Sequence, residues 1–250
     1  SVFKMIAGRS PNDPKHLAGQ STLSRFENSI RAKDLQRLRY VLLDQFIASF
    51  QTRPAQITID IDAFDDPTHG QQQLTFFHGY YKQFQYLPII ATCEENDQVM
   101  LVGLRHGTCK PSPGADDDLT FMVKHLREVW PDVQIHVRGD CGFGLPLIYE
   151  TCEKLGIWYT FGLAMNERLK AASEDLLAQA QLQFKETGEK ARLFMSMDYK
   201  ADKWDSPRTV SIKAEAHSGG TNRRAVVSNR PGARHFPEAT YDDYTRRGES

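Results

Sequence analysis

The sequence lacks the features that would place it in a membrane or build it around disulfides. No stretch approaches the roughly 20 consecutive apolar residues of a membrane-spanning helix. The opening residues also lack the apolar core of a secretory signal peptide. Cysteine is scarce and without the close pairs of a zinc knuckle: the four are Cys93, Cys109, Cys141 and Cys152. We therefore expect a cytoplasmic protein with reduced thiols and no membrane partner.

No excess of one charge is present either, since 31 Lys and Arg face 32 Asp and Glu. The charges are nevertheless uneven along the chain. Residues 1–53 carry a balance of +5, residues 54–188 a balance of −9 and residues 189–250 a balance of +3. An acidic centre between basic flanks is typical of a metal-carrying core whose flanks touch a polyanion, although ordinary charge scatter produces the same sums.

The stretch 56–70 is the most informative part of the sequence. Isoleucine alternates with polar residues over 57–62, which predicts a strand with one apolar face. The polar face ends in Asp60 and Asp62, and Pro67 breaks the strand soon afterwards. Burying an unpaired carboxylate is costly, so these acids favour a cation partner, and oxygen ligands suit magnesium or manganese. A polar strand edge that ends in a solvated turn fits the same pattern.

The rest of the pattern predicts an α/β domain with a mixed sheet. A capping-box spacing predicts a short helix that starts at Ser24, and three acids at 116–118 are expected to start another helix. We predict helices over 32–50, 116–129, 145–155 and 166–184, strands over 56–62, 86–93, 99–104, 133–140 and 157–162, and strand-like alternation over 189–230. In such sheets, chemistry gathers at the C-terminal ends of neighbouring parallel strands.

Two acids stand at predicted strand ends of this kind, Asp62 and Asp140. Carboxylates at adjacent strand ends can share two divalent cations roughly 3.5–4 Å apart. Such a pair of ions activates a water or a 3′-hydroxyl on one side of a phosphate and stabilises the leaving oxygen on the other. A third carboxylate usually completes such a site.

Several motifs together resemble the DDE-domain transposases of bacterial insertion sequences, in the branch called group 1. The motifs lie at 6–9, 23–28, 62–72, 77–81, 86–88, 138–143 and 161–164, so the resemblance covers nearly the whole chain. It implies a ribonuclease-H-like mixed sheet flanked by helices and interrupted by a β-rich insertion. It also implies two Mg²⁺ (or Mn²⁺) ions, cleavage at the terminal inverted repeats of a transposon, and joining to target DNA.

The resemblance also implies a division of the chain and a cellular setting. We expect a basic, helical N-terminal segment over 1–53, the first part of the catalytic core over 54–188, a β-rich insertion over 189–236 and the start of the catalytic C-terminal helix over 237–250. Because both ends look cut, we expect a fragment. We further expect a homodimer or larger assembly on double-stranded DNA, in the bacterial cytoplasm and associated with the nucleoid.

Carried over residue by residue, the resemblance makes Asp62 the first catalytic acid and metal ligand and Asp140 the second, with Asp60 as the alternative to the first. The family's C-terminal signature is a Tyr, an Arg three residues later and the catalytic Glu four residues beyond, and Tyr244 and Arg247 match its first two positions. The Glu would fall one place past Ser250. Glu249 is a weak stand-in, because two positions turn a helical side chain by about 200°.

Basic residues of the expected insertion are candidates for contact with the DNA backbone: Arg208, Lys213, Arg223, Arg224, Arg230 and Arg234. Such residues on exposed strands also serve only to keep edges soluble. Trp204 is expected in the core, with base stacking as the alternative. Three functions therefore stay open: a DDE transposase, a ribonuclease-H-like nuclease without strand transfer, and a DNA-binding remnant without chemistry.

Overall fold

The computed structural model describes residues 4–5, 8–10, 12–15, 17–70 and 72–248, which divide into two compact units at residues 41 and 42. The smaller unit contains α2 (Gln20–Ser29) and the first part of α3 (Ala32–Ala48). Helix α2 begins at Gln20, after Gly19, and not at Ser24 as the capping-box spacing predicted. The unit boundary falls within α3, upstream of the predicted boundary at residue 53.

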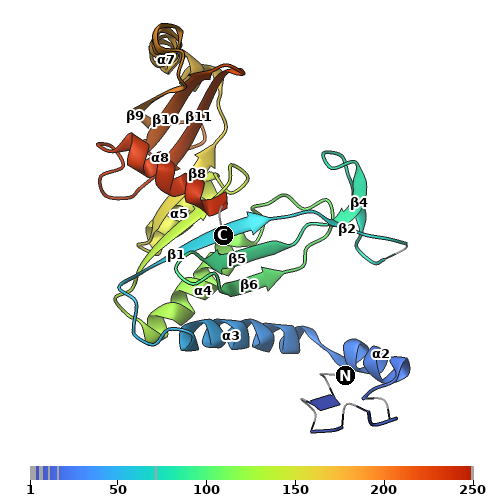
Figure 1. Ribbon diagram of the computed structural model, residues 1–250. Coiled ribbons are helices and arrows are strands. Elements are labelled where there is room, and N and C mark those ends of the chain that lie inside the picture. Colours follow the sequence, from blue (N-terminus) through green and yellow to red (C-terminus); the bar gives the residue numbers. More distant parts are fainter. Residues whose placement is uncertain (1–3, 6–7, 11, 16, 71, 249–250) are drawn as a thin grey trace. The chain divides into compact units, whose positions relative to one another are not determined.

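An eight-stranded sheet forms the centre of the larger unit (Figure 1), with the strand order β6-β5-β1-β7-β8-β11-β10-β9. Its strands are β1 (Gln56–Ala63), β5 (Ile89–Cys93), β6 (Val99–Gly103), β7 (Gln134–Gly139), β8 (Trp158–Leu163), β9 (Ala191–Tyr199), β10 (Arg208–His217) and β11 (Gly220–Ser228). Strands β1, β7 and β8 are parallel, and every other neighbouring pair is antiparallel. This mixed sheet with flanking helices confirms the predicted ribonuclease-H-like fold class.

The three strands of residues 189–236 extend this same sheet. Strand β11 pairs with β8 over Thr160–Leu163, and β10 and β9 follow as an antiparallel ribbon. The predicted β-rich insertion therefore continues the sheet of the core. A second, smaller sheet contains β2 (Asp66–Pro67), β3 (Phe76–His78) and β4 (Gln83–Tyr86).

One face of the large sheet is apolar and carries the core. Ile57, Ile59 and Ile61 are buried in one cluster with side chains of α4 (Ala115–Val129) and α5 (Pro146–Lys154). Helix α4 starts with the three predicted acids in its first turn, where carboxylates oppose the helix dipole favourably. Trp204 is buried in the same cluster, as expected for a core residue.

The predicted helix over 166–184 is two helices, α6 (Glu167–Ala172) and α7 (Glu174–Thr187). Ser173 separates them, because its hydroxyl donates to the carbonyl oxygen of Leu169 and competes with the helical backbone. Asn166 accepts a hydrogen bond from the backbone N–H of Leu169 and so starts α6. No helix within the described residues is long and apolar enough to cross a bilayer.

The opposite face of the sheet is polar. Over β8, β11, β10 and β9 it is covered by α8 (Pro237–Thr245), which runs into the short helix η1 (Arg246–Gly248) (Figure 1). Because side chains alternate along a strand, Asp60 and Asp62 share this face, and Arg138 and Asp140 share it on the neighbouring strand. The polar face therefore holds both predicted acids.

Candidate active site

The structure brings Asp62 and Asp140 to the same edge of the sheet. Strands β1 and β7 are parallel, and Ile61 is the register partner of Gly139. Asp62 follows Ile61 on β1, and Asp140 directly follows the last residue of β7. Neighbouring strands lie about 4.8 Å apart. Two acids that are far apart in the sequence are thus neighbours at adjacent C-terminal strand ends.

Each of these carboxylates uses one oxygen for a local hydrogen bond. The backbone N–H of Ala63 donates to Oδ1 of Asp62 at 2.8 Å, and that of Gly142 donates to Oδ1 of Asp140 at 2.9 Å. These bonds restrict how the two side chains turn, so that their positions are set before any ligand arrives. The side chain of Asp62 is 55% exposed and open to solvent.

Burial and neighbouring charges both change the pKa of Asp62. Partial burial raises the pKa of the Asp62 carboxyl, and the charges of Asp140 and Asp60 raise it further. The hydrogen bond from Ala63 and the guanidinium of Arg247 act in the opposite direction. A cation that binds between the two carboxylates would offset the repulsion that Asp62 feels from its acidic neighbours.

Asp60, the alternative ligand, already forms an ion pair with Arg138. It is buried, and Arg138 donates to both of its oxygens, from Nε at 2.7 Å and from Nη2 at 2.6 Å. A carboxylate whose two oxygens face one guanidinium fork is already neutralised and satisfied. The structure therefore leaves Asp62, not Asp60, as the acid of β1 that faces the open edge.

Among the described residues, no third side chain completes a metal-binding group with Asp62 and Asp140. Within residues 4–5, 8–10, 12–15, 17–70 and 72–248 no three His, Cys, Asp or Glu side chains are grouped so that they could hold a metal ion. Glu249, the weak stand-in for the third acid, lies outside the described residues. The hard oxygen donors of Asp62 and Asp140 nevertheless suit Mg²⁺ or Mn²⁺.

The two residues that match the C-terminal signature do reach the acidic edge. Nη1 of Arg247 lies 3.7 Å from Oδ2 of Asp62, and its guanidinium lies over the ring of Tyr244 at 5.3 Å. Tyr244 passes close to the end of β8: a Cβ atom added to Gly162 would lie 2.8 Å from the Tyr244 hydroxyl and 2.8 Å from the backbone nitrogen of Cys141. Helix α8 is thus docked closely enough that only glycine fits at position 162.

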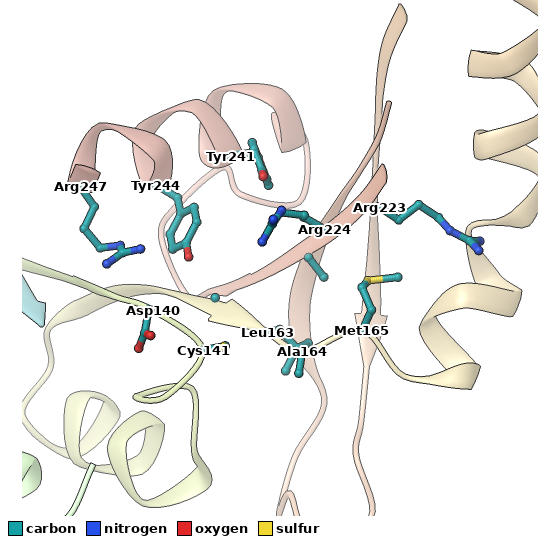
Figure 2. Close-up of a pocket in the computed structure, with 12 residues that line it drawn as sticks. Asp140, Cys141, Leu163, Ala164, Met165, Arg223, Arg224, Tyr241, Tyr244 and Arg247 are labelled. Carbon is teal, nitrogen blue, oxygen red and sulfur yellow. The ribbon is translucent and has the colours of Figure 1, made fainter. Parts of the chain in front are cut away.

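A pocket of about 350 Å³ opens beside Asp140, between the end of β8, strand β11 and helix α8 (Figure 2). Arg224 extends into it toward Tyr241 and Tyr244, whereas Arg223 points away toward α6 and α7. Arg223 is occupied there, because its Nη1 donates to Glu174 at 2.8 Å and to the carbonyl oxygen of Lys170. The pocket therefore combines the second acid with an arginine and two aromatic rings.

The six basic candidates for DNA contact differ in their burial and in whether they form an ion pair. Arg208 is buried, with both arms of its guanidinium on Glu153, and Lys213 is buried against Glu215 at 3.1 Å. Their burial removes these two from contact with a DNA backbone. The other paired candidates, with their partners, are Arg223 with Glu174, Arg230 with Asp243 and Arg234 with Asp198. Arg224 is exposed and has no carboxylate partner among the described residues.

Sequence reasoning missed Arg138, Asp243 and Gly162. Arg138 lies two residues before Asp140, so strand alternation alone places it on the same face, and that signal was available. The carboxylate of Asp243 pairs with Arg230, which follows the distant strand β11, and this contact has no local signal. Gly162 stands in a motif that was recognised, but its need for glycine follows from the close approach of the Cys141 backbone and of Tyr244, which only the structure shows.

Comparisons with known proteins place the chain in a family. The model of the family "Transposase DDE domain group 1" matches residues 1–250. A search of curated proteins finds no match. Among solved structures, the Mos1 transposase paired-end complex with left transposon end is 12% identical, with a TM-score of 0.28, over 63% of this chain and 47% of that chain. This chain thus spans about half of the Mos1 transposase chain.

The NurA nuclease from Sulfolobus solfataricus is also similar, at 9% identity and a TM-score of 0.35, over 87% of this chain and 84% of that chain. The match to the family model spans the whole chain. The chain therefore belongs to the transposase DDE domain group 1 family.

Proposed function

We propose that this chain is a DNA transposase of the DDE type, which cuts DNA strands at transposon ends and joins the freed 3′-hydroxyl to target DNA. The observation that carries the proposal is the meeting of Asp62 and Asp140 at adjacent ends of the parallel strands β1 and β7. In open α/β sheets this edge is where chemistry is placed.

Asp62 and Asp140 would hold the two divalent ions, Mg²⁺ or Mn²⁺, of this family. When bound, such ions supply activation of the attacking hydroxyl and stabilisation of the leaving oxygen. The protein's own part is to fix the ligands. The N–H groups of Ala63 and Gly142 hold one oxygen of each carboxylate and so restrict how each side chain turns.

Arg224, Tyr244 and Arg247 would bind the DNA strand next to the scissile phosphate. They line the pocket that contains Asp140, and a guanidinium and a phenol both donate hydrogen bonds to phosphate oxygens. The DNA partners in this proposal are the terminal inverted repeats of the transposon and the target duplex, bound by a homodimer or larger assembly.

The family's signature puts the third acid four residues after Arg247, at a position that this sequence does not include. Arg247 already contacts the edge through Asp62, and residues four apart share a helical face. The lack of a third acid among the described residues favours a second candidate function, that of a DNA-binding remnant without chemistry. Both candidates predict DNA binding, but only the first predicts cleavage.

The test is cleavage of a labelled transposon-end duplex in Mg²⁺ or Mn²⁺ by the protein expressed from its complete reading frame. Substituting a residue that only supports a metal ligand typically lowers metal affinity or activity about 10–100-fold. Loss of a ligand itself, in Asp62→Asn or Asp140→Asn, should therefore lower the cleavage rate at least about 100-fold. Asp132→Asn is the matched control, because Asp132 is an exposed acid near the opposite end of β7, where it pairs with Arg53. Full cleavage by both site variants would refute the assignment of the acids.

The products separate the remaining alternatives. A transposase gives joined products when a supercoiled target plasmid is added, whereas a nuclease without strand transfer gives only cut ends. A parent protein that binds the end duplex but yields neither product in either metal is the DNA-binding remnant.

A further inference from the structure

Arg138 is the largest of the fully buried side chains, and it lies on the same face of β7 as Asp140. Its guanidinium contacts three separate elements. It donates to Asp60 of β1, lies 3.2 Å from Glu94 in the turn between β5 and β6, and donates from Nη1 to the carbonyl oxygen of Asp243 in α8 at 2.7 Å.

The contact with α8 is made at the end of the helix. Asp243 lies in the last turn of α8, where the final four carbonyl groups have no partner within the helix. A cation donating to one of them satisfies that oxygen and opposes the negative end of the helix dipole. Arg138 therefore caps α8 from the sheet, one residue before Tyr244.

Further ion pairs close a ring around this contact. The carboxylate of Asp243 pairs with Arg230 at 2.6 Å and with Arg246 at 2.5 Å, and Arg246 lies 3.5 Å from Glu94. The end of α8 is thus tied to β7, to the segment after β11 and to the turn after β5. Rotation of this end about the helix axis would break several of these contacts together.

A buried ion pair is a weak source of stability, because the desolvation of two charges offsets their attraction. Its directional bonds do, however, fix a geometry. An arginine fork can hold Asp60 with two arms and the Asp243 carbonyl with the third, whereas an ammonium group is a single point of charge. The arrangement is therefore suited to orientation.

We propose that Arg138 is a positioning residue, with Asp60 as its counter-ion, that fixes the end of α8 so that Tyr244 and Arg247 meet the edge formed by Asp62 and Asp140. This inference rests on the proposed function for its role in cleavage. The positioning itself is a property of the protein without DNA or metal, so it is tested on the free protein.

The central variant is the double substitution Asp60→Asn with Arg138→Gln. It removes both buried charges, so that neither is left alone, and it removes the cap on α8. We expect an unfolding midpoint close to that of the parent. Backbone amides at the end of α8 should nevertheless exchange with solvent at least about tenfold faster, because their local opening becomes easier. Cleavage should fall about 100-fold, the effect of a displacement of about 1 Å at a catalytic edge, while the Kd for the end duplex changes less than about twofold.

Arg138→Lys is the second variant, in case the double variant fails to fold. It keeps a charge beside Asp60 but lacks the arm that reaches Asp243, so faster exchange confined to the end of α8 is again expected. Arg127→Gln is the matched control. Arg127 also donates to backbone carbonyls at the end of a helix, at Leu155 beyond α5, but that helix packs on the apolar face.

A folded double variant, or a folded Arg138→Lys, with parental exchange at the end of α8 would overturn the positioning role. So would parental cleavage in the presence of faster exchange. If the parent itself cuts no DNA, faster exchange in the variants still supports the positioning role while the proposed function fails.

Discussion

Replacing Arg224 with glutamine should change how DNA binding depends on salt. Each phosphate that a cation contacts releases condensed counterions, so the logarithm of the binding constant falls with the logarithm of salt concentration by about 0.9 per contact. Arg224 is exposed in the pocket beside Asp140 and has no carboxylate partner among the described residues. Its positive charge is thus available for one phosphate contact.

The expected size follows from one lost contact. Between 50 and 200 mM salt, a slope smaller by about 0.9 changes the ratio of the two Kd values by about 3.5-fold. Arg224→Gln should therefore bind the end duplex more weakly than the parent at 50 mM, and the difference should shrink by that factor at 200 mM. Fluorescence anisotropy with a labelled end duplex at several salt concentrations measures both slopes.

Arg234→Gln is the control for this experiment, because Arg234 is a half-exposed arginine of the same region whose charge is paired with Asp198 at 2.7 Å. Its slope should equal that of the parent. Arg224 would not be a phosphate contact if the salt slope of Arg224→Gln matched that of the parent. The same would follow if Arg234→Gln reduced the slope as much as Arg224→Gln does. Whether an arginine has a carboxylate partner would then not predict whether it binds DNA.

Two further changes test the packing of α8 on the polar face. Burial lowers the pKa of His136 to about 3, so that below pH 6.5 only the unfolded chain takes up its proton. The free energy of unfolding should therefore drop between pH 7 and pH 5, by about 2 kcal/mol more in the parent than in His136→Gln. Urea titrations at each pH measure this, and parallel curves would contradict it. Gly162→Ala should lower the free energy of unfolding by about 1–3 kcal/mol, because its Cβ would collide with backbone and with Tyr244. Gly19→Ala, where a Cβ meets no atom within 4 Å, should not do so, and equal stability of the two variants would argue against the close docking of α8.

Much of the fold follows from local patterns. The alternation of apolar and polar residues over 57–62 predicts β1 and its two faces, and that prediction is confirmed. The path of 189–236 does not follow in this way. Whether a strand ribbon stands alone or joins an existing sheet depends on its pairing with β8 through Ala225–Ser228, and such long-range pairing has no local signature.

The same distinction applies to the site. Strand ends mark Asp62 and Asp140, because a carboxylate after an apolar strand is unusual wherever it occurs. Asp60 has the same local pattern as Asp62, and only the register that sets it opposite Arg138 shows that it is an ion-pair partner. The partner of Arg208 lies 55 residues away, at Glu153, so no reading of neighbouring residues separates this buried arginine from the exposed Arg224.

The polar face also explains why α8 is a suitable carrier of catalytic side chains. Apolar packing is non-directional and tolerates small rotations of a helix. Beneath α8, the imidazole Nε2 of His136 lies 3.0 Å from the hydroxyl of Thr160, which lies 3.0 Å from that of Ser228. Arg138 caps the helix end from the neighbouring position. These contacts depend on angle as well as distance, so they favour one orientation of the groups that make them. A helix docked in this way keeps its rotation about its own axis, which is the property needed if side chains on one face of that helix are to meet two acids at the edge of a sheet.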